Sequence, residues 1–199
     1  VDEVHMAKAD ALKTLLTTVM ARVPLRWGLT GTVPKEPFEF QALKCSLGPV
    51  INQLSASELQ ERGVLAQCHV NIVQLVDHAE FSNYQSELKF LLEEPDRLAA
   101  IAKLVTHVND TGNTLVLVDR AVGINIPRIF NLVLLEPGKS FVRVIQSIGR
   151  GIRKAEDKDH VQIWDITSTC KFAKRHLTKR KVFYRDAEYP FSQEKLEWK

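Results

Sequence analysis

The sequence predicts an α/β protein with a mostly parallel sheet, on two observations. Three short aliphatic runs, at residues 114–118, 132–135 and 161–166, are typical of strands that are buried on both faces of a parallel sheet. Segments whose apolar residues have helical spacing alternate with these strand-like segments. Because parallel strands are joined by crossover connections that usually contain a helix, the alternation indicates an α/β fold.

The first 63 residues predict two helices and one strand. Residues 6–21 are good helix formers whose apolar side chains share one face, so we expect a helix that packs on a sheet. Those side chains are Leu12, Leu15, Leu16, Val19 and Met20. Residues 25–29 are an apolar run that predicts a buried strand, ended by a turn at residues 30–32. Residues 52–63 predict a short helix.

The following residues supply a strand and two helices before the first aliphatic run. Residues 67–76 alternate as a strand does, and residues 82–92 and 96–108 have helical patterns. Val118 ends the first run, and a loop with Gly123 begins five residues later. This distance leaves no room for a crossover between parallel strands. We therefore expect that residues are missing between Arg120 and Ala121.

Composition favours a soluble globular protein. The 199 residues are 45% apolar and 26% charged. No apolar run approaches the roughly 18 residues of a membrane-spanning helix, and the first residues lack the pattern of a signal peptide. The three cysteines are widely spaced, which suits neither a zinc site nor a disulfide framework. We expect a soluble, cytoplasmic protein with reduced thiols and no membrane partner.

The net charge of +3 hides a basic C-terminal third. Residues 1–138 carry 12 Lys and Arg against 16 Asp and Glu, a balance of −4, whereas residues 139–199 carry 15 against 8, a balance of +7. A solvated surface and a polyanion-binding end are both compatible with this split.

Three short motifs carry candidate chemistry. Asp2 and Glu3 open an Asp-Glu-x-His motif, in which the Asp can hold phosphate-bound magnesium and the Glu can activate water, although acidic pairs are usually solvated surface. Small hydroxyl residues surround Gly31, as in an ordinary turn or a hydrogen-bond relay. Residues 146–153 read Gln-x-x-Gly-Arg-x-x-Arg, which on a helix places Arg150 and Arg153 on one face, the geometry of arginine fingers.

In this order, the motifs resemble the motor core of superfamily 2 helicases. Residues 2–5 match motif II, 30–32 motif III, 115–120 motif IV, 123–128 motif V and 146–153 motif VI. The run from Phe130 through Asp165, with the basic segment after it, looks like the phage branch-migration helicases of the UvsW type. The resemblance implies two RecA-like lobes, each incomplete in this chain. Residues 1–80 would belong to the first lobe and 81–170 to the second, with 171–199 a basic C-terminal segment.

The resemblance also implies the cofactors and the site residues. ATP would lie between the lobes, with Mg²⁺ on Asp2 and Glu3 as the water-activating base. Gln146 would couple the lobes together with His5, and Arg150 and Arg153 would contact phosphate. The other nucleotide contacts would be His5, Gly123 and Asn125, and the nucleic-acid contacts would include Thr30, Thr32 and Arg120.

The chain departs from the family in one respect. The phosphate-binding loop Gly-x-x-x-x-Gly-Lys-Ser/Thr is absent from the 199 residues. Gly138-Lys139-Ser140 does not supply it, because Val133 stands where the first glycine would be. An isolated chain of this sequence should bind ATP poorly, and we expect the parent protein to be longer.

Residues 171–185 contain seven cations and no acid, interleaved with aromatic residues. The cations could neutralise phosphates while Phe172, Phe183 and Tyr184 stack on bases, or the segment could be an amphipathic helix that docks Phe172 and Leu177 on the second lobe. We favour DNA contact. The contacting residues would be Lys174, Arg175, Lys179, Arg180 and Lys181.

The sequence thus predicts an ATP-dependent DNA helicase or translocase, a monomer, that unwinds or branch-migrates forked and junction DNA in replication, recombination or repair. An RNA helicase and a restriction-type motor subunit are alternatives within the superfamily. A non-catalytic nucleic-acid-binding module is the alternative from another class.

Overall fold

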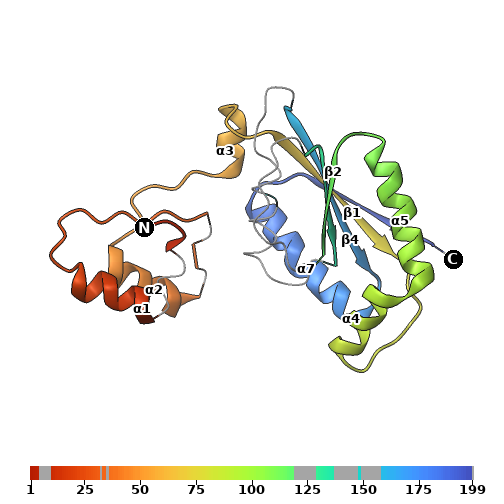
Figure 1. The fold of residues 1–199 in the computed structure, drawn as a ribbon, viewed down its shortest axis with the longest axis horizontal. Coiled ribbons are helices and arrows are strands. Elements are labelled where there is room, and N and C mark those ends of the chain that lie inside the picture. The colour runs from red at the N-terminus through yellow and green to blue at the C-terminus, as the bar shows by residue number, and fades with distance from the viewer. Residues whose placement is uncertain are drawn as a thin grey trace. The chain divides into compact units, whose positions relative to one another are not determined.

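The computed structural model describes residues 1–4, 10–31, 33–34, 36–118, 129–136, 148 and 158–198. The chain consists of two compact units, Val1–Leu54 and Ser55–Lys199 (Figure 1). This division falls earlier than the predicted boundary at residue 80, because the strand β1 (Gln67–Leu75) pairs with strands of the second unit. The predicted boundary at residue 170 also falls inside this unit.

The second unit is built on a five-stranded, all-parallel sheet. Its strand order is β2 (Thr114–Val118), β3 (Asn131–Leu135), β4 (His160–Ser168), β1 and β5 (Phe191–Leu196). Each neighbouring pair is parallel, as in the pairing of Cys68 with Val161 between β1 and β4. The predicted α/β class with a mostly parallel, RecA-like sheet is confirmed.

Helices cover both faces of this sheet (Figure 1). On one face, Leu177 and Tyr184 of α7 (Lys171–Asp186) share a core with Val70 and Ile163. On the other face, α5 (Pro95–Asn109) buries Ile101 and Val108 among alternate strand residues such as Val73 and Val133. The strand residues alternate between the two cores because successive side chains of a strand point to opposite faces.

The aliphatic runs are buried to different extents. Residues of β3 are buried throughout, as predicted for a strand covered on both faces. The same prediction is wrong for β2, in which Val116 is 39% and Val118 is 48% exposed. The reason is position, because β2 is an edge strand that pairs only with β3 in the described sheet.

The predicted helices of this unit are confirmed within a few residues. They are α3 (Ala56–Glu61), α4 (Tyr84–Glu93) and α5. The side chain of Asn83 caps α4 by accepting a hydrogen bond from the backbone N–H of Ser86. Beyond the end of α5, Gly112 has a φ of 143°, and a Cβ there would lie 2.9 Å from the Cβ of Phe130, so only glycine fits.

The first unit holds α1 (Asp10–Thr14), the π-helix η2 (Leu15–Val19) and α2 (Pro37–Leu47). The helix predicted at residues 6–21 is confirmed over residues 10–19, whereas residues 20 and 21 form a turn. Its expected packing on a sheet is wrong for the described part of this unit, because Leu16 packs instead against Val4 and Leu43 of α2. The buried strand predicted at residues 25–29 is also wrong. These residues form no regular strand, and Leu25, Trp27 and Leu29 are 75%, 64% and 63% exposed.

No helix in the ranges given above is long and apolar enough to cross a membrane.

Candidate functional site

The structure places the predicted Asp2 and Glu3 beside the segment that leads to Thr30. The N-terminal amine of Val1 donates to the carbonyl of Trp27 at 2.6 Å, and the N–H of Leu29 donates back to the carbonyl of Val1 at 2.9 Å. The N–H of Val4 donates to the carbonyl of Leu29 at 3.0 Å. Two motifs that are distant in the sequence are therefore adjacent in the first unit.

Glu3 has a left-handed backbone conformation, with a φ of 49°. This conformation is disfavoured for a residue with a Cβ, and such residues cluster at functional sites. The Asp2 carboxylate stabilises the turn locally, because its Oδ1 accepts a hydrogen bond from the Glu3 N–H at 2.9 Å. Both acidic side chains remain exposed, while Val4 is buried in the core of the unit.

Gly28 allows the two segments to lie this close. A Cβ on Gly28 would meet Cδ1 of Leu47 at 2.7 Å and Cγ2 of Val4 at 3.1 Å. A side chain there would push against the core that fixes Val4, and Val4 directly follows the acidic pair. A Cβ on Gly31, by contrast, would have nothing within 4 Å.

The acidic pair fits the chemistry of a magnesium ligand only in part. A carboxylate oxygen suits Mg²⁺, which is usually bound through one or two carboxylates with phosphate oxygens and waters. The Asp2 carboxylate is exposed and retains lone pairs besides the one that accepts from Glu3. Among the described residues, however, no cluster of three or more His, Cys, Asp or Glu could hold a metal by itself.

The remaining predicted nucleotide-site residues lie outside the described residues, together with two predicted nucleic-acid contacts. They are His5, Thr32, Arg120, Gly123, Asn125, Gln146, Arg150 and Arg153.

The predicted nucleic-acid contacts on α7 divide into exposed and buried cations. Lys174, Arg175 and Lys179 are exposed, and Lys181 is half-buried with its ammonium bonded to the side chain of Gln193. Arg180 is 1% exposed. The expectation that Arg180 contacts nucleic acid is therefore wrong, because its guanidinium lies in the core beneath α7.

The partner of Arg180 is a buried carboxylate at the centre of the sheet. Its Nε and Nη2 donate to the two oxygens of Asp165 at 2.8 and 2.9 Å, and the hydroxyl of Tyr184 donates to the same carboxylate at 2.7 Å. Burial alone lowers the pKa of Arg180, but the charge of Asp165 and the hydrogen bonds to it raise that pKa above its ordinary value. The prediction that Tyr184 stacks on bases is wrong too, since its ring is fully buried.

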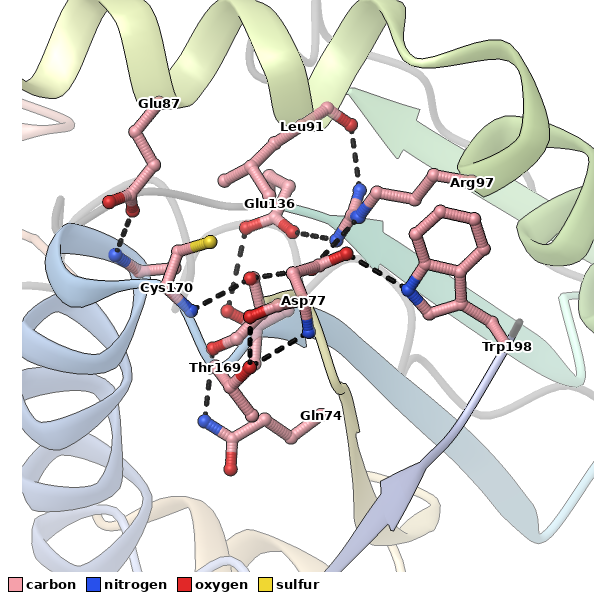
Figure 2. Close-up of polar contacts among 12 residues, drawn as sticks. Gln74, Asp77, Glu87, Leu91, Arg97, Glu136, Thr169, Cys170 and Trp198 are labelled. Carbon is pink, nitrogen blue, oxygen red and sulfur yellow. Dashed lines mark hydrogen bonds and ion pairs between the residues drawn. The ribbon is translucent and has the colours of Figure 1, made fainter. Parts of the chain in front are cut away.

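A second buried polar network lies at the carboxyl ends of β1, β3 and β4 (Figure 2). The guanidinium of Arg97 donates to Asp77 at 3.2 Å, to Glu136 at 2.7 Å and to the carbonyl of Leu91 at 2.7 Å. Ser168 donates to Asp77 at 2.6 Å. In the described part of the chain, no buried side-chain nitrogen or oxygen lacks a partner. The network therefore fixes α5 to the ends of three strands.

The position of this network corresponds to a topological switch point. β1 and β4 are neighbours, yet the chain after β1 continues to α5 on one face of the sheet, and β4 leads into α7 on the other. In open α/β sheets, ligands bind outside the carboxyl ends of strands at such a point. Asp77 and Thr169, which hydrogen-bond to each other there, lie two residues after β1 and one residue after β4.

The sequence motifs do not predict this network. Asp77 and Glu136 could have been found, because each comes just after a predicted strand. Arg97 gives no such signal, since a single arginine within a helical pattern is usually solvent-exposed.

Glu136 is the unusual acid of the network. Burial raises its pKa to about 7, although the charge of Arg97 partly opposes this shift. Arg97 contacts two carboxylates, those of Asp77 and Glu136, so a proton on Glu136 leaves these three side chains without net charge.

Another buried acid, Glu87, caps α7. The carboxylate of Glu87, on α4, accepts hydrogen bonds from the backbone N–H groups of Phe172 at 3.0 Å and Ala173 at 2.6 Å. Glu87 has no exposed surface. It satisfies two of the free amides at the helix N-terminus and places a negative charge at the positive end of the helix dipole.

Two solved structures share the fold of this chain. The crystal structure of T4 UvsW aligns with a TM-score of 0.56 and 15% identity, covering 100% of this chain and 53% of that chain. The ATP-dependent Type ISP restriction-modification enzyme LlaBIII bound to DNA aligns with a TM-score of 0.54 and 12% identity, covering 98% of this chain and 21% of that chain. At these identities the similarity shows a shared fold.

The chain spans about half the length of the UvsW chain and about a fifth of the LlaBIII chain. No protein-family model matches the sequence, and no curated protein matches it.

Proposed function

We propose that the protein is an ATP-dependent DNA helicase or translocase that unwinds or branch-migrates forked and junction DNA in replication, recombination or repair. The proposal rests on the coincidence of two findings in one chain. A helicase-like fold extends over the whole chain, and the helicase-like motifs follow one another in family order along it. Neither finding alone would suffice, because a fold can host unrelated activities and each motif is short.

The nucleotide-binding part of the proposal rests on the acidic pair and the second-lobe arginines. Asp2 would hold Mg²⁺, which neutralises the phosphate charge of bound ATP, and Glu3 would orient the attacking water. The backbone pairing of Val1 and Val4 with residues 27–29 supports this, because it links the acidic pair to Thr30. From the second lobe, Arg150 and Arg153 would contact the phosphates. Gln146, His5, Gly123 and Asn125 complete the proposed nucleotide contacts.

The nucleic-acid part rests on α7. Its exposed Lys174, Arg175 and Lys179 lie on the outer side of the helix, whereas Leu177 and Arg180 lie on its buried side. Phosphate contacts by such cations give binding that weakens with salt. Thr30, Thr32 and Arg120 are further proposed contacts. The half-buried Lys181 of α7 is another.

The decisive assay is DNA-stimulated ATP hydrolysis by the complete gene product, because the 199 residues contain no phosphate-binding loop. Arg150→Ala should nearly abolish hydrolysis and leave DNA binding largely intact. Arg22→Ala, which removes an exposed arginine with no proposed role, is the matched control and should hydrolyse ATP like the wild type. Turnover near the wild-type rate in Arg150→Ala would refute the arginine-finger assignment.

A restriction-type motor is a second candidate, because the similarity to the LlaBIII enzyme is nearly as high as that to UvsW. Comparing ATPase stimulation by RNA, linear duplex DNA and branched DNA separates the candidates. Branched DNA should stimulate most if the proposal is right, duplex DNA if the protein is a restriction-type motor, and RNA if it is an RNA helicase. DNA binding without any hydrolysis would indicate a non-catalytic module.

A further inference from the structure

Three aromatic rings from two helices meet beside the exposed cations of α7. The ring of Tyr84, at the start of α4, packs edge-on against Phe172 with centroids 6.2 Å apart and against His176 with centroids 5.1 Å apart. All three rings are half-buried. None of them belongs to the cores on the two faces of the sheet. Sheet packing therefore does not account for this cluster.

Two cations lie close to the Phe172 ring of the cluster. Nζ of Lys171 and Cζ of Arg175 lie 5.9 and 5.8 Å from the centroid of the Phe172 ring. Lys174 and Lys179 extend the exposed basic stripe along the same helix. No acid interrupts residues 171–185, so the stripe is complementary to a chain of phosphates.

The N-terminus of α7 is not available to an anion, which restricts how a phosphate can bind. Glu87 already accepts hydrogen bonds from the amides of Phe172 and Ala173, and its carboxylate would repel a phosphate placed there. Phosphates must therefore be bound by the side chains of Lys171, Lys174 and Arg175. These side chains extend from the same turns of the helix as Phe172 and His176.

We infer that Tyr84, Phe172 and His176 form a stacking site for unpaired bases of single-stranded DNA, with the α7 cations on the adjoining phosphates. Rings beside a cationic track are the features by which proteins bind single strands without reading sequence. A base inside a duplex is stacked on both faces, so only an unpaired base can use these rings. The inference rests on the proposed function and specifies which form of DNA this surface binds.

The experiment compares binding of a single strand and of a duplex of equal length by fluorescence anisotropy over a salt series. Tyr84→Leu/His176→Leu should weaken single-strand binding by about tenfold or more, because each stacked base contributes roughly 1–3 kcal/mol. Duplex binding and the salt slope should stay unchanged. Tyr84→Phe/His176→Phe should restore single-strand binding, since the rings are kept. Phe90→Leu, from the separate Phe81–Phe90 ring pair, is the matched control.

A charge variant separates this inference from the proposed function. Lys174→Gln/Lys179→Gln should weaken single-strand and duplex binding alike and reduce the salt slope by about one for each cation that contacts a phosphate. If this variant loses binding while the leucine variant binds like the wild type, the stacking site is refuted and DNA binding by α7 stands. If the wild type binds neither form of DNA, both proposals fail.

A fluorescence measurement on the wild-type protein tests the inference even if the leucine variants do not fold. A single strand carrying 2-aminopurine should lose fluorescence on binding, because the base stacks on an aromatic ring. Unchanged fluorescence in a saturated complex would overturn the inference.

Discussion

Removing the guanidinium of Arg180 should destabilise the protein without changing the DNA binding that we propose for α7. In Arg180→Met, the carboxylate of Asp165 would stay buried with Tyr184 as its remaining partner among the hydrogen bonds described above. Breaking a buried ion pair on one side costs about 3–5 kcal/mol, because an uncompensated charge is left in the interior. This is a large part of the roughly 5–15 kcal/mol that stabilises a typical protein.

The magnitude can be isolated with a double-mutant cycle measured by urea unfolding. Asp165→Asn/Arg180→Met removes both charges, and it should recover about 2 kcal/mol or more relative to Arg180→Met alone. Lys179→Met, next to Arg180 on the exposed side of α7, is the matched control. It should change the unfolding free energy by no more than about 0.5 kcal/mol, as for other surface substitutions.

DNA binding provides the second half of the test. Lys179→Met should reduce the salt slope by about one if Lys179 contacts a phosphate, whereas folded Arg180→Met should keep the wild-type slope. Equal stability of Arg180→Met and Lys179→Met would refute the buried ion pair. A reduced slope in Arg180→Met would restore the sequence-based expectation that Arg180 contacts DNA.

Two further predictions concern packing and pH. Gly28→Val should destabilise the first unit by about 1–3 kcal/mol through overpacking against Leu47 and Val4, whereas Gly31→Val should cost less than half as much. Thermal unfolding compares the stabilities of the two variants. Equal losses of stability would contradict the close approach of Gly28 to Leu47 and Val4. Glu136 has a folded pKa of about 7 against an ordinary 4.5, so the folded state binds this proton more tightly. Its stabilising effect is complete below pH 4.5 and is lost as the pH rises through about 7, on the order of 3 kcal/mol in total. Urea unfolding at pH 5 and pH 8 should show a smaller pH dependence in Glu136→Gln than in the wild type, and an equal pH dependence would refute the raised pKa.

Local patterns predicted β1, β2, β3 and β4 of the second unit but not β5. The runs that form β3 and β4 are aliphatic because helices cover both faces of the sheet. The composition of each run therefore predicts that the strand is buried. Val116 and Val118 of β2 have the same composition but lie at an edge, and composition alone does not reveal which strand lies there. The exposed Leu25, Trp27 and Leu29 show the same limit of prediction from composition, since an apolar run does not reveal whether other residues cover it.

Charged residues were harder to interpret, because their role depends on partners that are distant in the sequence. Arg180 lies among cations that face solvent, and only its position on the helix separates it from Lys179 and Lys181. The sequence shows that Asp165 lies in a strand and that Glu136 follows one, but it does not show their partners. Arg180 follows Asp165 by 15 residues, and Arg97 precedes Glu136 by 39 residues. The basic balance of the last third therefore counted a buried structural cation among the surface charges.

The buried acids connect α7 with the carboxyl ends of the central strands. Glu87 holds the first turn of α7 and Asp165 holds its middle, so the exposed cations project from a helix that cannot easily reorient. From the N-terminus of α7, hydrogen bonds lead from Cys170 to Ser168, to Asp77, and through Arg97 to Glu136. Each link of this chain of hydrogen bonds joins described residues, so a ligand bound by the exposed cations of α7 would be connected through it to the carboxyl end of β3 at Glu136.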